Sequence, residues 1–285
     1  IGRGGMGTVF EAVRNDGAFD QRVAIKLIRR GFDTDDIVDR FRRERQILAM
    51  VNHPNIGRLL DGGASPDGRP FFVLELIDGR TLMEHCRDAK VSLDERLRLF
   101  RDICAAVSHA HQNLIIHRDL KPANIMVTGQ PGQQTQVKLL DFGIAKLVEQ
   151  DHSQVTRAAS SLLTPDYASP EQVRGEPVTT ATDVYALGLI LFELLTGKKA
   201  QRVSSPALAD IERAVCETVP VKPSALTLEG VTHTAAKLRG DLDNIVLKAL
   251  QKDPQRRYQS VTQFAEDIVR FQAGHPVIAR PDSFA

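Results

Sequence analysis

The stretch "IIHRDLKPANIMV", residues 115–127, sets charged and polar side chains between two apolar runs. These runs, residues 114–116 and 125–127, have the composition of buried chain. The polar members between them are His117, Arg118, Asp119, Lys121 and Asn124. Because a charge is costly to bury unless it is paired or binds an ion, this stretch predicts a functional site held against the core.

Oxygen donors recur in and after this stretch. Asp119 and Asn124 lie five residues apart, and Asp141 follows in "LLDFG". Carboxylate and amide oxygens can orient a hydroxyl group or bind Mg²⁺, which takes few protein ligands and keeps phosphates and water as the others. A single aspartate could simply cap a turn. Three such donors together with Lys121, beside two short predicted strands, indicate a magnesium site instead.

The composition sets limits on the function. The chain has 285 residues and a formal net charge of +1, so no overall field favours nucleic acid or an anionic membrane as a partner. With 42% hydrophobic residues it can form one large core or two smaller ones. No apolar run reaches the roughly 18 residues that a membrane span needs. The longest, residues 184–195, is interrupted by Gly188 and Glu193 and predicts a buried helix.

The cysteines and the ends of the chain suggest a context. Three widely separated cysteines without metal-type spacing predict small buried apolar residues in a reducing, cytoplasmic compartment. They are Cys86, Cys104 and Cys216. The chain opens on Ile1 rather than Met and stops just after "RPD", so we expect a piece of a longer protein.

The hydrophobic pattern changes near residues 77–79, from β-rich to helical. Before this point we expect strands at 8–13, 22–28 and 71–76. We also expect a helix that begins at the capping residue Thr34 and ends at His53-Pro54, with Ile37, Phe41, Leu48 and Val51 on one face. After it we expect a helix that begins with a capping box at Ser92 and Glu95 and has an apolar stripe of Leu97, Phe100, Cys104, Val107 and Leu114. We then expect strands at 125–127 and 137–140, and helices at 183–195, 208–215, 242–250 and 261–271. The pattern predicts a small β-rich lobe followed by a larger α-helical lobe.

The N-terminal segment carries three glycines in the pattern Gly2-x-Gly4-x-x-Gly7, followed by Val9. Glycines let backbone N–H groups approach a phosphate closely, because no Cβ stands in the way. A strand rather than a helix follows the pattern, which excludes a dinucleotide-binding fold start. A hairpin flap over phosphates and an ordinary glycine-rich turn both remain open.

Lys26 lies within the predicted strand 22–28, on the same side as Ala24 and Ile28. A lysine on this face must extend into solvent or contact an anion. Glu44 is the only charge on the inward face of the helix predicted after this strand, so the two side chains are natural partners. This pairing would hold the amine for phosphate oxygens. The alternative is that Glu44 is one of several solvated charges in "RFRRERQ".

Several motifs now stand in one order along the chain, namely the glycine loop 2–9, Val23-Ala24-Ile25-Lys26, His117-Arg118-Asp119-Leu120-Lys121-Pro122-x-Asn124, Asp141-Phe142-Gly143 and Ser169-Pro170-Glu171. In this order and over nearly the whole chain they resemble a protein kinase catalytic domain. The resemblance implies a two-lobed α+β kinase fold over residues 1–285, with a β-rich N-lobe at 1–77 that lacks the start of its first strand, and a helical C-lobe at 78–285.

The resemblance also implies roles for individual residues. Asp119 would accept or orient the proton of the substrate hydroxyl, and Lys121 would contact the γ-phosphate. Lys26, paired with Glu44, would hold the α- and β-phosphates of ATP. The metal ligands, for Mg²⁺ or Mn²⁺, would be Asn124 and Asp141. The nucleotide would be contacted by Ile1, Gly2, Gly4, Gly7, Val9, Ala24, Lys26, Glu75, Leu76 and Met126.

Further family features would stabilise the C-lobe and regulate it. Leu48, Leu59, His117 and Phe142 match a stacked apolar spine, anchored by Asp183. Glu171 is expected to pair with Arg257. A phosphate on the activation loop would pair with Arg118. The candidate phosphorylation sites are Thr156, Ser160 and Ser161.

"HRDLKP" and Thr164 resemble serine/threonine kinases, and "YASPEQVRG" resembles the bacterial ones, so the expected substrates are Ser/Thr side chains of proteins, including this chain itself. The resemblance places the domain in the cytoplasm, alone or as part of a membrane-anchored parent. Two positions depart from the family pattern: Leu163 stands where a glycine is usual, and Gly57 where Val or Ile is usual.

Two other functions are compatible with a chain that resembles a protein kinase. A pseudokinase scaffold predicts loss of Lys26, Asp119, Asn124 or Asp141, and all four are present. A small-molecule kinase of related fold typically lacks the Ser-Pro-Glu segment at 169–171, which this chain has.

Overall fold

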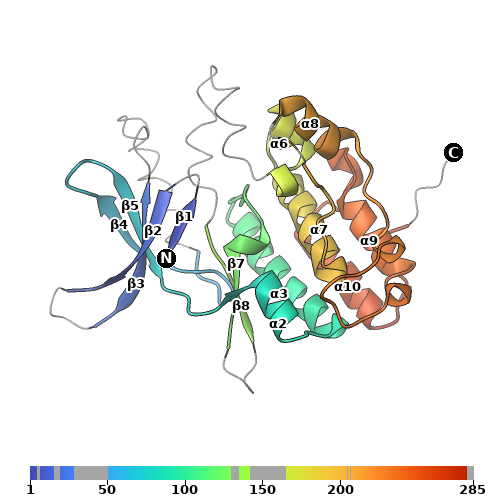
Figure 1. The fold of residues 1–285 in the computed structure, drawn as a ribbon, viewed down its shortest axis with the longest axis horizontal. Coiled ribbons are helices and arrows are strands. Elements are labelled where there is room, and N and C mark those ends of the chain that lie inside the picture. The colour runs from blue at the N-terminus through green and yellow to red at the C-terminus, as the bar shows by residue number, and fades with distance from the viewer. Residues whose placement is uncertain are drawn as a thin grey trace. The chain divides into compact units, whose positions relative to one another are not determined.

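A computed structural model describes residues 1–4, 7–15, 20–28, 51–129, 135–141, 165–203, 205 and 207–280 (Figure 1). The described residues fall into two compact units. The first unit ends at Asp78 and the second begins at Gly79. The division falls where the sequence changes from a strand pattern to a helical pattern.

The first unit is built on a five-stranded antiparallel sheet with the strand order β1-β2-β3-β5-β4. Its strands are β1 (Gly2–Gly4), β2 (Gly7–Val13), β3 (Arg22–Ile28), β4 (Leu59–Ala64) and β5 (Pro70–Glu75). The strands predicted at 8–13, 22–28 and 71–76 are therefore confirmed within one residue at either end. Their β-branched and aromatic content explains why the chain is extended here.

The face of β3 that carries Lys26 is largely buried. Ala24 and Ile28 are buried, and Lys26 lies between them on the same face of the strand. Opposite Lys26 on β5 stands Phe72, which is 1% exposed and packs with Ile28. The amine of Lys26 is thus carried by a sheet face that is otherwise apolar, as the sequence predicted.

The helix predicted between Thr34 and His53 falls almost wholly outside the described residues, and with it Ile37, Phe41, Glu44 and Leu48. Val51, at its expected end, is buried. After it, Ile56 N donates to His53 O at 3.1 Å, which forms a turn at His53-Pro54.

The second unit contains helices and one small three-stranded sheet, with the order β6-β7-β8. Its strands are β6 (Arg80–Thr81), β7 (Ile125–Thr128) and β8 (Gln136–Leu139). Its helices are α2 (Leu82–Asp88), α3 (Leu93–Gln112), α6 (Pro170–Arg174), α7 (Thr180–Thr196), α8 (Leu208–Glu212), α9 (Asp241–Ala249) and α10 (Val261–Gln272). A π-helical turn, Arg213–Glu217, continues α8.

The helix α7 is buried almost all round, as its sequence predicted (yellow in Figure 1). It packs against α3, α9 and α10. Gly188 permits this packing, because a Cβ there would come within 2.9 Å of the Ala249 side chain. Thr179 caps the first turn through Ala181 N, and Gly197 ends the helix with a left-handed φ of 71°.

The start of α3 is confirmed in part. Ser92 accepts a hydrogen bond from Glu95 N at 3.3 Å, as a capping residue should. The carboxylate of Glu95 does not return to Ser92 as the predicted capping box requires. It binds Arg98 and Thr135 instead, at 2.6 and 3.1 Å.

The end of the predicted stripe on α3 is wrong. Phe100, Cys104 and Val107 are fully buried or nearly so, but Leu114 is 94% exposed. The helix ends at Gln112, and Leu114 has a φ of 60° in the left-handed region. The chain reverses there, so the helical periodicity no longer applies and the side chain points away from the core.

Arg96 lies on the buried face of α3 and is only 1% exposed. Its guanidinium group donates to backbone carbonyl oxygens at 2.9–3.1 Å, those of Cys86, Val91, Leu194 and Gly230. Two of these carbonyls belong to the last turns of α2 and α7, where the helix dipole is negative. The buried charge is therefore compensated by helix ends rather than by a carboxylate.

The predicted burial of the cysteines is confirmed, since all three are buried and free. Burial raises the pKa of Cys86 to about 11, and it also raises the pKa of Cys104 and Cys216. These thiols therefore stay protonated at neutral pH. Across the described ranges, we find no helix with the length and apolar content of a membrane span.

Candidate active site

The hairpin of β7 and β8 brings the two predicted metal ligands to one end of the small sheet. Ile125 pairs with Leu139, and Leu140 N donates to Asn124 O at 2.8 Å. Asn124 precedes β7 and Asp141 follows β8, so both residues emerge at the same edge. Their amide and carboxylate oxygens suit a hard cation such as Mg²⁺.

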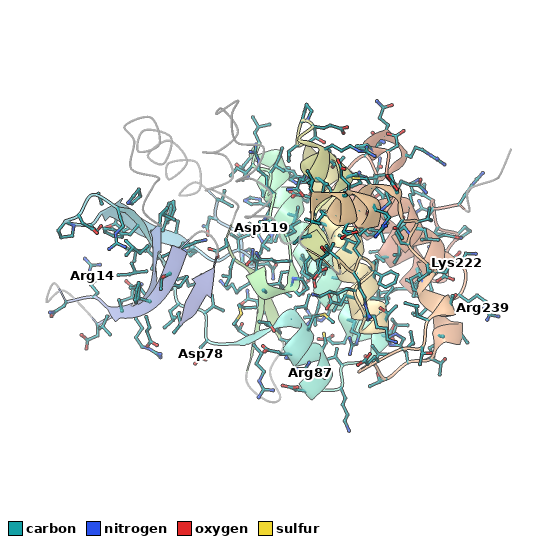
Figure 2. The ribbon with its side chains drawn as sticks, turned by 45° about the horizontal axis from the view of Figure 1, so that its top comes forward. Arg14, Asp78, Arg87, Asp119, Lys222 and Arg239 are labelled. Atoms are coloured by element: carbon teal, nitrogen blue, oxygen red, sulfur yellow. The ribbon has the colours of Figure 1, made fainter. Side chains whose placement is uncertain are left out.

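Asp119, Lys121 and Asn124 form a hydrogen-bonded group in the loop before β7. Lys121 Nζ lies 2.8 Å from Asp119 Oδ2. Asn124 Nδ2 donates to the Asp119 backbone oxygen at 2.9 Å and to its Oδ2 at 3.3 Å. Because both bonds of Asn124 use its nitrogen, its amide oxygen is not consumed by them. The Asp119 side chain, labelled in Figure 2, is 10% exposed, whereas Arg87, Lys222 and Arg239 extend into solvent.

His117 connects this loop to the residue that follows β8. Its Nε2 lies 3.0 Å from Leu140 O, which can only accept, so Nε2 carries the proton. Its Nδ1 then accepts a hydrogen bond from Asp119 N at 3.3 Å. Burial lowers the pKa of His117, although the nearby Asp183 and Asp119 charges oppose this shift. The imidazole therefore remains neutral and ties the loop to the strand that leads to Asp141.

Asp183, on the buried helix α7, holds the backbone of the same loop. Its Oδ2 accepts from His117 N at 2.8 Å and its Oδ1 from Arg118 N at 3.0 Å. His111 Nε2 lies 2.8 Å from Oδ2. Asp183 is 1% exposed, so these bonds lie in a low-dielectric setting. Asp183 was predicted to anchor a spine of Leu48, Leu59, His117 and Phe142. Its bond from His117 N agrees with this prediction for His117 alone, because Leu48 and Phe142 lie outside the described residues.

Two non-glycine residues near the site lie in the left-handed region, and Asp183 holds the first of them, Arg118, through its N–H. Arg118 has a φ of 66° and Asp141 a φ of 53°, both left-handed. Such a residue costs about 1–2 kcal/mol when it is not glycine. Gln172 Nε2 adds a bond to Arg118 O at 2.8 Å and so connects the loop to α6.

Replacing Asp183 by Asn should release this loop. The amide keeps one oxygen, so whichever way it is oriented, its NH₂ group faces the N–H of either His117 or Arg118. Losing a buried hydrogen bond costs about 1–3 kcal/mol, so amide exchange at His117 or Arg118 should accelerate roughly ten- to hundredfold. Hydrogen–deuterium exchange read by NMR measures this.

The matched control is Asp243→Asn, in another buried aspartate, which is 3% exposed and binds Ser224 N at 2.9 Å. This variant should leave exchange at His117 and Arg118 unchanged. Equal protection of the loop in Asp183→Asn and the parent protein would contradict the anchoring role.

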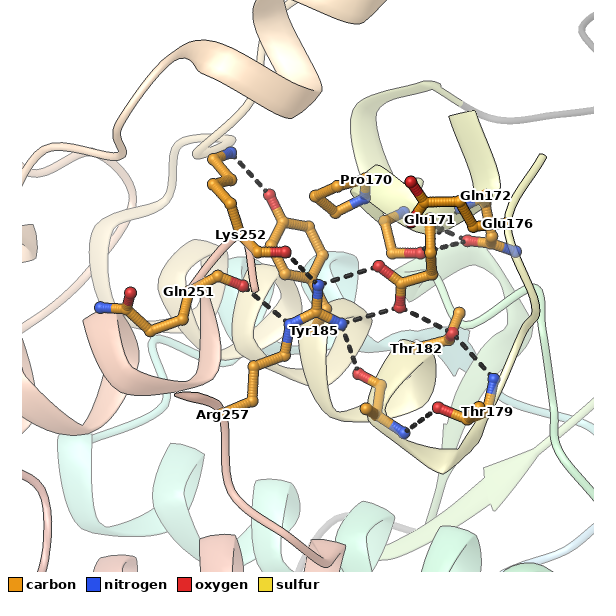
Figure 3. A network of polar contacts seen from close by, with 12 residues as sticks. Pro170, Glu171, Gln172, Glu176, Thr179, Thr182, Tyr185, Gln251, Lys252 and Arg257 are labelled. Atoms are coloured by element: carbon orange, nitrogen blue, oxygen red, sulfur yellow. Dashed lines mark hydrogen bonds and ion pairs between the residues drawn. The ribbon is translucent and has the colours of Figure 1, made fainter. Parts of the chain in front are cut away.

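The predicted pair of Glu171 and Arg257 is confirmed (Figure 3). Both nitrogens of the guanidinium fork, NH1 and NH2, bind the two carboxylate oxygens at 2.8 Å. Thr182 Oγ1 donates to Glu171 Oε1 at 2.8 Å. Burial would raise the pKa of Glu171, but the hydrogen bonds and charge of Arg257 outweigh burial and hold this pKa below its usual value. The pair fixes α6 to the segment before α10.

The first unit carries most of the predicted nucleotide residues. The glycine pattern lies on the hairpin of β1 and β2, where Gly4 pairs with Gly7 and Gly2 with Val9. The Ile1 amino group donates to Val9 O at 2.8 Å. Gly7 has a packing reason to be glycine, because a Cβ there would lie 2.2 Å from Leu27 O. The described residues form an antiparallel pair of strands, which agrees with both a flap over phosphates and an ordinary glycine-rich turn.

The remaining nucleotide candidates lie on strands or just after them. On β3, Ala24 is paired with Leu74 and Lys26 with Phe72, while Val9 of β2 is the other neighbour of Lys26. Glu75 ends β5 and Leu76 follows it. Met126 lies on β7 of the second unit. Other residues singled out from the sequence lie outside the described residues, namely Glu44, Leu48, Phe142, Gly143, Thr156, Ser160, Ser161, Leu163 and Thr164.

The sequence reasoning missed three residues that support the site: His111, Gln172 and Thr182. His111 is one of two histidines at the end of α3, and its partner Asp183 is 72 residues away. Gln172 and Thr182 carry no charge. Since their contacts come from distant segments, no local pattern could have indicated them.

Comparison with known proteins gives the same family throughout. A family model described as the protein kinase domain matches residues 1–269. The chain is 38% identical to the serine/threonine-protein kinase PknB of Mycobacterium tuberculosis, over 97% of this chain and 42% of that protein. It is 37% identical to a probable serine/threonine-protein kinase of Streptomyces coelicolor, over 97% of this chain and 40% of that protein.

The fold agrees with solved structures. The kinase domain of M. tuberculosis PknI matches with a TM-score of 0.70 and 28% identity, over 96% of this chain and 93% of that one. A Rad53 structure, in complex with AMP-PNP, matches with a TM-score of 0.67 and 24% identity, over 93% of this chain and 62% of that one. The chain spans about two fifths of its curated relatives, 42% for PknB. With an antiparallel-sheet N-lobe, a helical C-lobe and a family match over residues 1–269, the chain belongs to the protein kinase domain family.

Proposed function

We propose that this chain transfers the γ-phosphoryl group of ATP to serine and threonine hydroxyls of proteins. The observation that carries the proposal is the group of Asp119, Lys121 and Asn124, held together within 2.8–3.3 Å. The names of the bacterial relatives support the Ser/Thr class. The AMP-PNP complex of Rad53 supports a nucleotide with the shape of ATP.

In this reaction Asp119 accepts the proton of the substrate hydroxyl or orients that hydroxyl for attack. Lys121, which lies against the Asp119 carboxylate, places a positive charge where the γ-phosphate must be. Asn124 and Asp141 would hold Mg²⁺ or Mn²⁺, and their oxygen donors fit such an ion. The bound metal supplies positive charge to the phosphates. Hydrogen bonds from His117 and Asp183 keep these groups in place, so little reorganisation is needed during transfer.

We propose further that residues 1–285 act as one catalytic domain. The residues proposed to bind the nucleotide are Ile1, Gly2, Gly4, Gly7, Val9, Ala24, Lys26, Glu75, Leu76 and Met126. Lys26 would contact the phosphates and be positioned by Glu44. The apolar surroundings of Lys26 support this role, because an amine on a buried sheet face favours an anionic partner.

Replacing Lys26 by Met should lower kcat/KM for ATP by roughly two to three orders of magnitude, the usual effect of removing one group that stabilises developing charge. Arg22→Met is the matched control, because Arg22 lies on the same strand in an exposed ion pair with Glu11. This control should lie within about twofold of the parent protein. Steady-state kinetics with varied ATP measures both. An unchanged kcat/KM in Lys26→Met would remove Lys26 from the proposed site.

The proposed function is tested by incubating the protein with [γ-³²P]ATP, Mg²⁺ and three peptides that differ only in carrying Ser, Thr or Tyr. We expect label on the Ser and Thr peptides and none on the Tyr peptide. A pseudokinase scaffold would label no peptide, and a small-molecule kinase would label an added aminoglycoside but no peptide. Either result would contradict the proposal.

Autophosphorylation is part of the same proposal. Thr156, Ser160 and Ser161 are the candidate acceptors, and self-association would allow one copy to modify another. Mapping of phosphates by mass spectrometry, with Asp119→Asn protein as the acceptor for the active protein, tests transfer between copies. We propose a cytoplasmic location, alone or within a membrane-anchored parent, with proteins and not nucleic acids as partners.

A further inference from the structure

The segment that leads into α6 is held by the side-chain amide of Gln201. Gln201 Nε2 lies 3.1 Å from Ala168 O and 3.5 Å from the backbone oxygens of Pro165 and Asp166. These three carbonyls belong to the short helical turn Pro165–Tyr167 and its end. Gln201 is 3% exposed, so its amide is committed to these contacts.

A chain of polar groups behind Gln201 sets the orientation of its amide. Tyr185 Oη lies 2.5 Å from Gln201 Oε1, and Lys252 Nζ lies 2.9 Å from Tyr185 Oη, as Figure 3 shows for the second contact. Lys252 also donates to Val215 O at 2.5 Å. Tyr185 is fully buried on α7, and Lys252 follows α9.

The direction of this chain of hydrogen bonds is determined. A lysine ammonium group only donates, so the Tyr185 oxygen must accept from Lys252. The Tyr185 O–H then points to Gln201 Oε1. This places the NH₂ group of Gln201 toward the carbonyls of residues 165–168. Each group therefore depends on the one before it, beginning with the charge of Lys252.

The segment held in this way is connected to the catalytic loop. Tyr167 Oη donates to Glu193 at 2.5 Å, and Lys199 Nζ binds Asp166 at 2.6 Å. A few residues further on, Gln172 Nε2 binds the backbone oxygen of Arg118, the neighbour of Asp119. Residues 165–168 are therefore connected, through the start of α6, to the backbone of the residue before Asp119.

We propose that Lys252, Tyr185 and Gln201 form a relay that positions residues 165–168 to bind the protein substrate, with Gln201 as the positioning residue. The inference rests on the proposed kinase function and adds residues outside the catalytic motifs. In this relay the side chains contact the segment and each other, and the segment contacts the peptide. Disturbing the relay therefore weakens peptide binding more than ATP binding or the transfer step.

The relay also makes peptide binding depend on pH. Burial lowers the pKa of Lys252 to about 8. The charged and titratable groups around it are Cys216, Arg257 and Arg174, with Glu171 and Arg257 near the Tyr185 ring. Once Lys252 loses its proton, its nitrogen can accept from Tyr185, and the Tyr185 O–H turns away from Gln201. The KM for peptide should then rise as pH increases through about 8, while the KM for ATP should not.

The test is steady-state kinetics with a serine peptide at saturating ATP and Mg²⁺, between pH 6.5 and 9.5. Lys252→Met should raise the KM for peptide about tenfold at pH 7 and make it independent of pH, with kcat and the KM for ATP within about twofold of the parent. Lys252→Arg keeps the charge at every pH, so it should keep a low KM and lose the rise above pH 8. Lys248→Met is the matched control, because Lys248 lies on α9 four residues before Lys252 and contacts the Tyr258 ring at 5.1 Å instead of Tyr185.

Two results would overturn the relay. They are an unchanged peptide KM in Lys252→Met, whether or not kcat falls, and a rise of the peptide KM of the same size in Lys248→Met. A second readout needs no activity. Ala168 N donates to Pro165 O at 3.3 Å, so its amide exchange reports the held turn. Faster exchange in Lys252→Met and Tyr185→Phe supports the relay, and unchanged exchange contradicts it, even if the parent protein phosphorylates no peptide.

Discussion

Replacing Asp119 by Asn is expected to lower kcat for peptide phosphorylation about 10²- to 10⁴-fold, with little change in ATP affinity. In the proposed reaction this carboxylate takes the substrate proton or orients the hydroxyl. In the parent protein it receives Lys121 Nζ at 2.8 Å and Asn124 Nδ2 at 3.3 Å. An amide at this position offers one oxygen and turns a donor toward one of these donors. Asp119→Asn therefore removes both the proton acceptor and the negative charge that the two donors surround.

Incorporation of ³²P into the peptide and into the protein itself measures the first quantity, and fluorescence titration with a nucleotide analogue measures the second. The matched control is Asp88→Asn, whose carboxylate is exposed in a surface ion pair with Arg80. Such pairs contribute about 0–1 kcal/mol, so this variant should behave like the parent. Equal incorporation by Asp119→Asn and the parent would refute the kinase assignment.

Local patterns were sufficient to predict the strands β2, β3, β5, β7 and β8 and the buried helix α7, but the strands β1, β4 and β6 were not predicted. The short apolar run in residues 22–28, rich in Val and Ile, favours a strand, and the longer apolar run in α7 favours a central buried helix. The prediction at Leu114 was wrong because composition does not indicate a left-handed turn at a leucine. Arg96 could have been found, since it lies three residues after Leu93 and four before Phe100, on the face that the stripe defines.

The residues of the site that belong to a sequence motif could be predicted, and the residues that support them could not. Asp119, Asn124 and Asp141 stand close in sequence, with a hairpin between the last two. The supporting groups do not, since Lys252 lies 67 residues from Tyr185 and His111 lies 72 from Asp183. Such contacts arise from packing of whole helices, which a single sequence does not specify residue by residue.

Replacing Arg257 by Met should lower the free energy of unfolding by about 3–5 kcal/mol, because it leaves a buried carboxylate without its partner. Glu171 is 3% exposed and Arg257 is 2% exposed. Arg257 also donates to the backbone oxygens of Ala181, Gln251 and Lys252 at 2.7–3.0 Å. Methionine fills similar volume but satisfies none of these acceptors. Urea unfolding at pH 7 measures the loss.

The control for this prediction is an exposed pair of the same length. Arg213 lies 2.8 Å from Asp210, and its side chain is 69% exposed. Arg213→Met should cost only about 0–1 kcal/mol, because solvent screens the pair and hydrates the remaining carboxylate. A similar loss in the two variants would show that burial does not determine the strength of the Glu171–Arg257 pair.

The pH dependence separates a lost charge partner from a lost side-chain volume. In the parent protein the pKa of Glu171 is lowered, so the pair stabilises above the unfolded pKa of about 4.3, and this stabilisation is lost as pH falls through the folded pKa. Without Arg257, burial raises the pKa of Glu171, and the variant becomes relatively more stable as pH falls. The difference between parent and Arg257→Met should therefore shrink toward pH 4.

Adding Glu171→Gln to Arg257→Met should recover part of the loss, because the double variant buries no unpaired charge. Glu171→Gln alone should cost less than Arg257→Met, since the guanidinium keeps its three backbone acceptors. If the losses of the two single variants simply add in the double variant and the gap stays constant with pH, the two residues act as independent packing groups. The buried pair would then not be what holds α6, and with it the end of the segment 165–168, against the rest of the second unit.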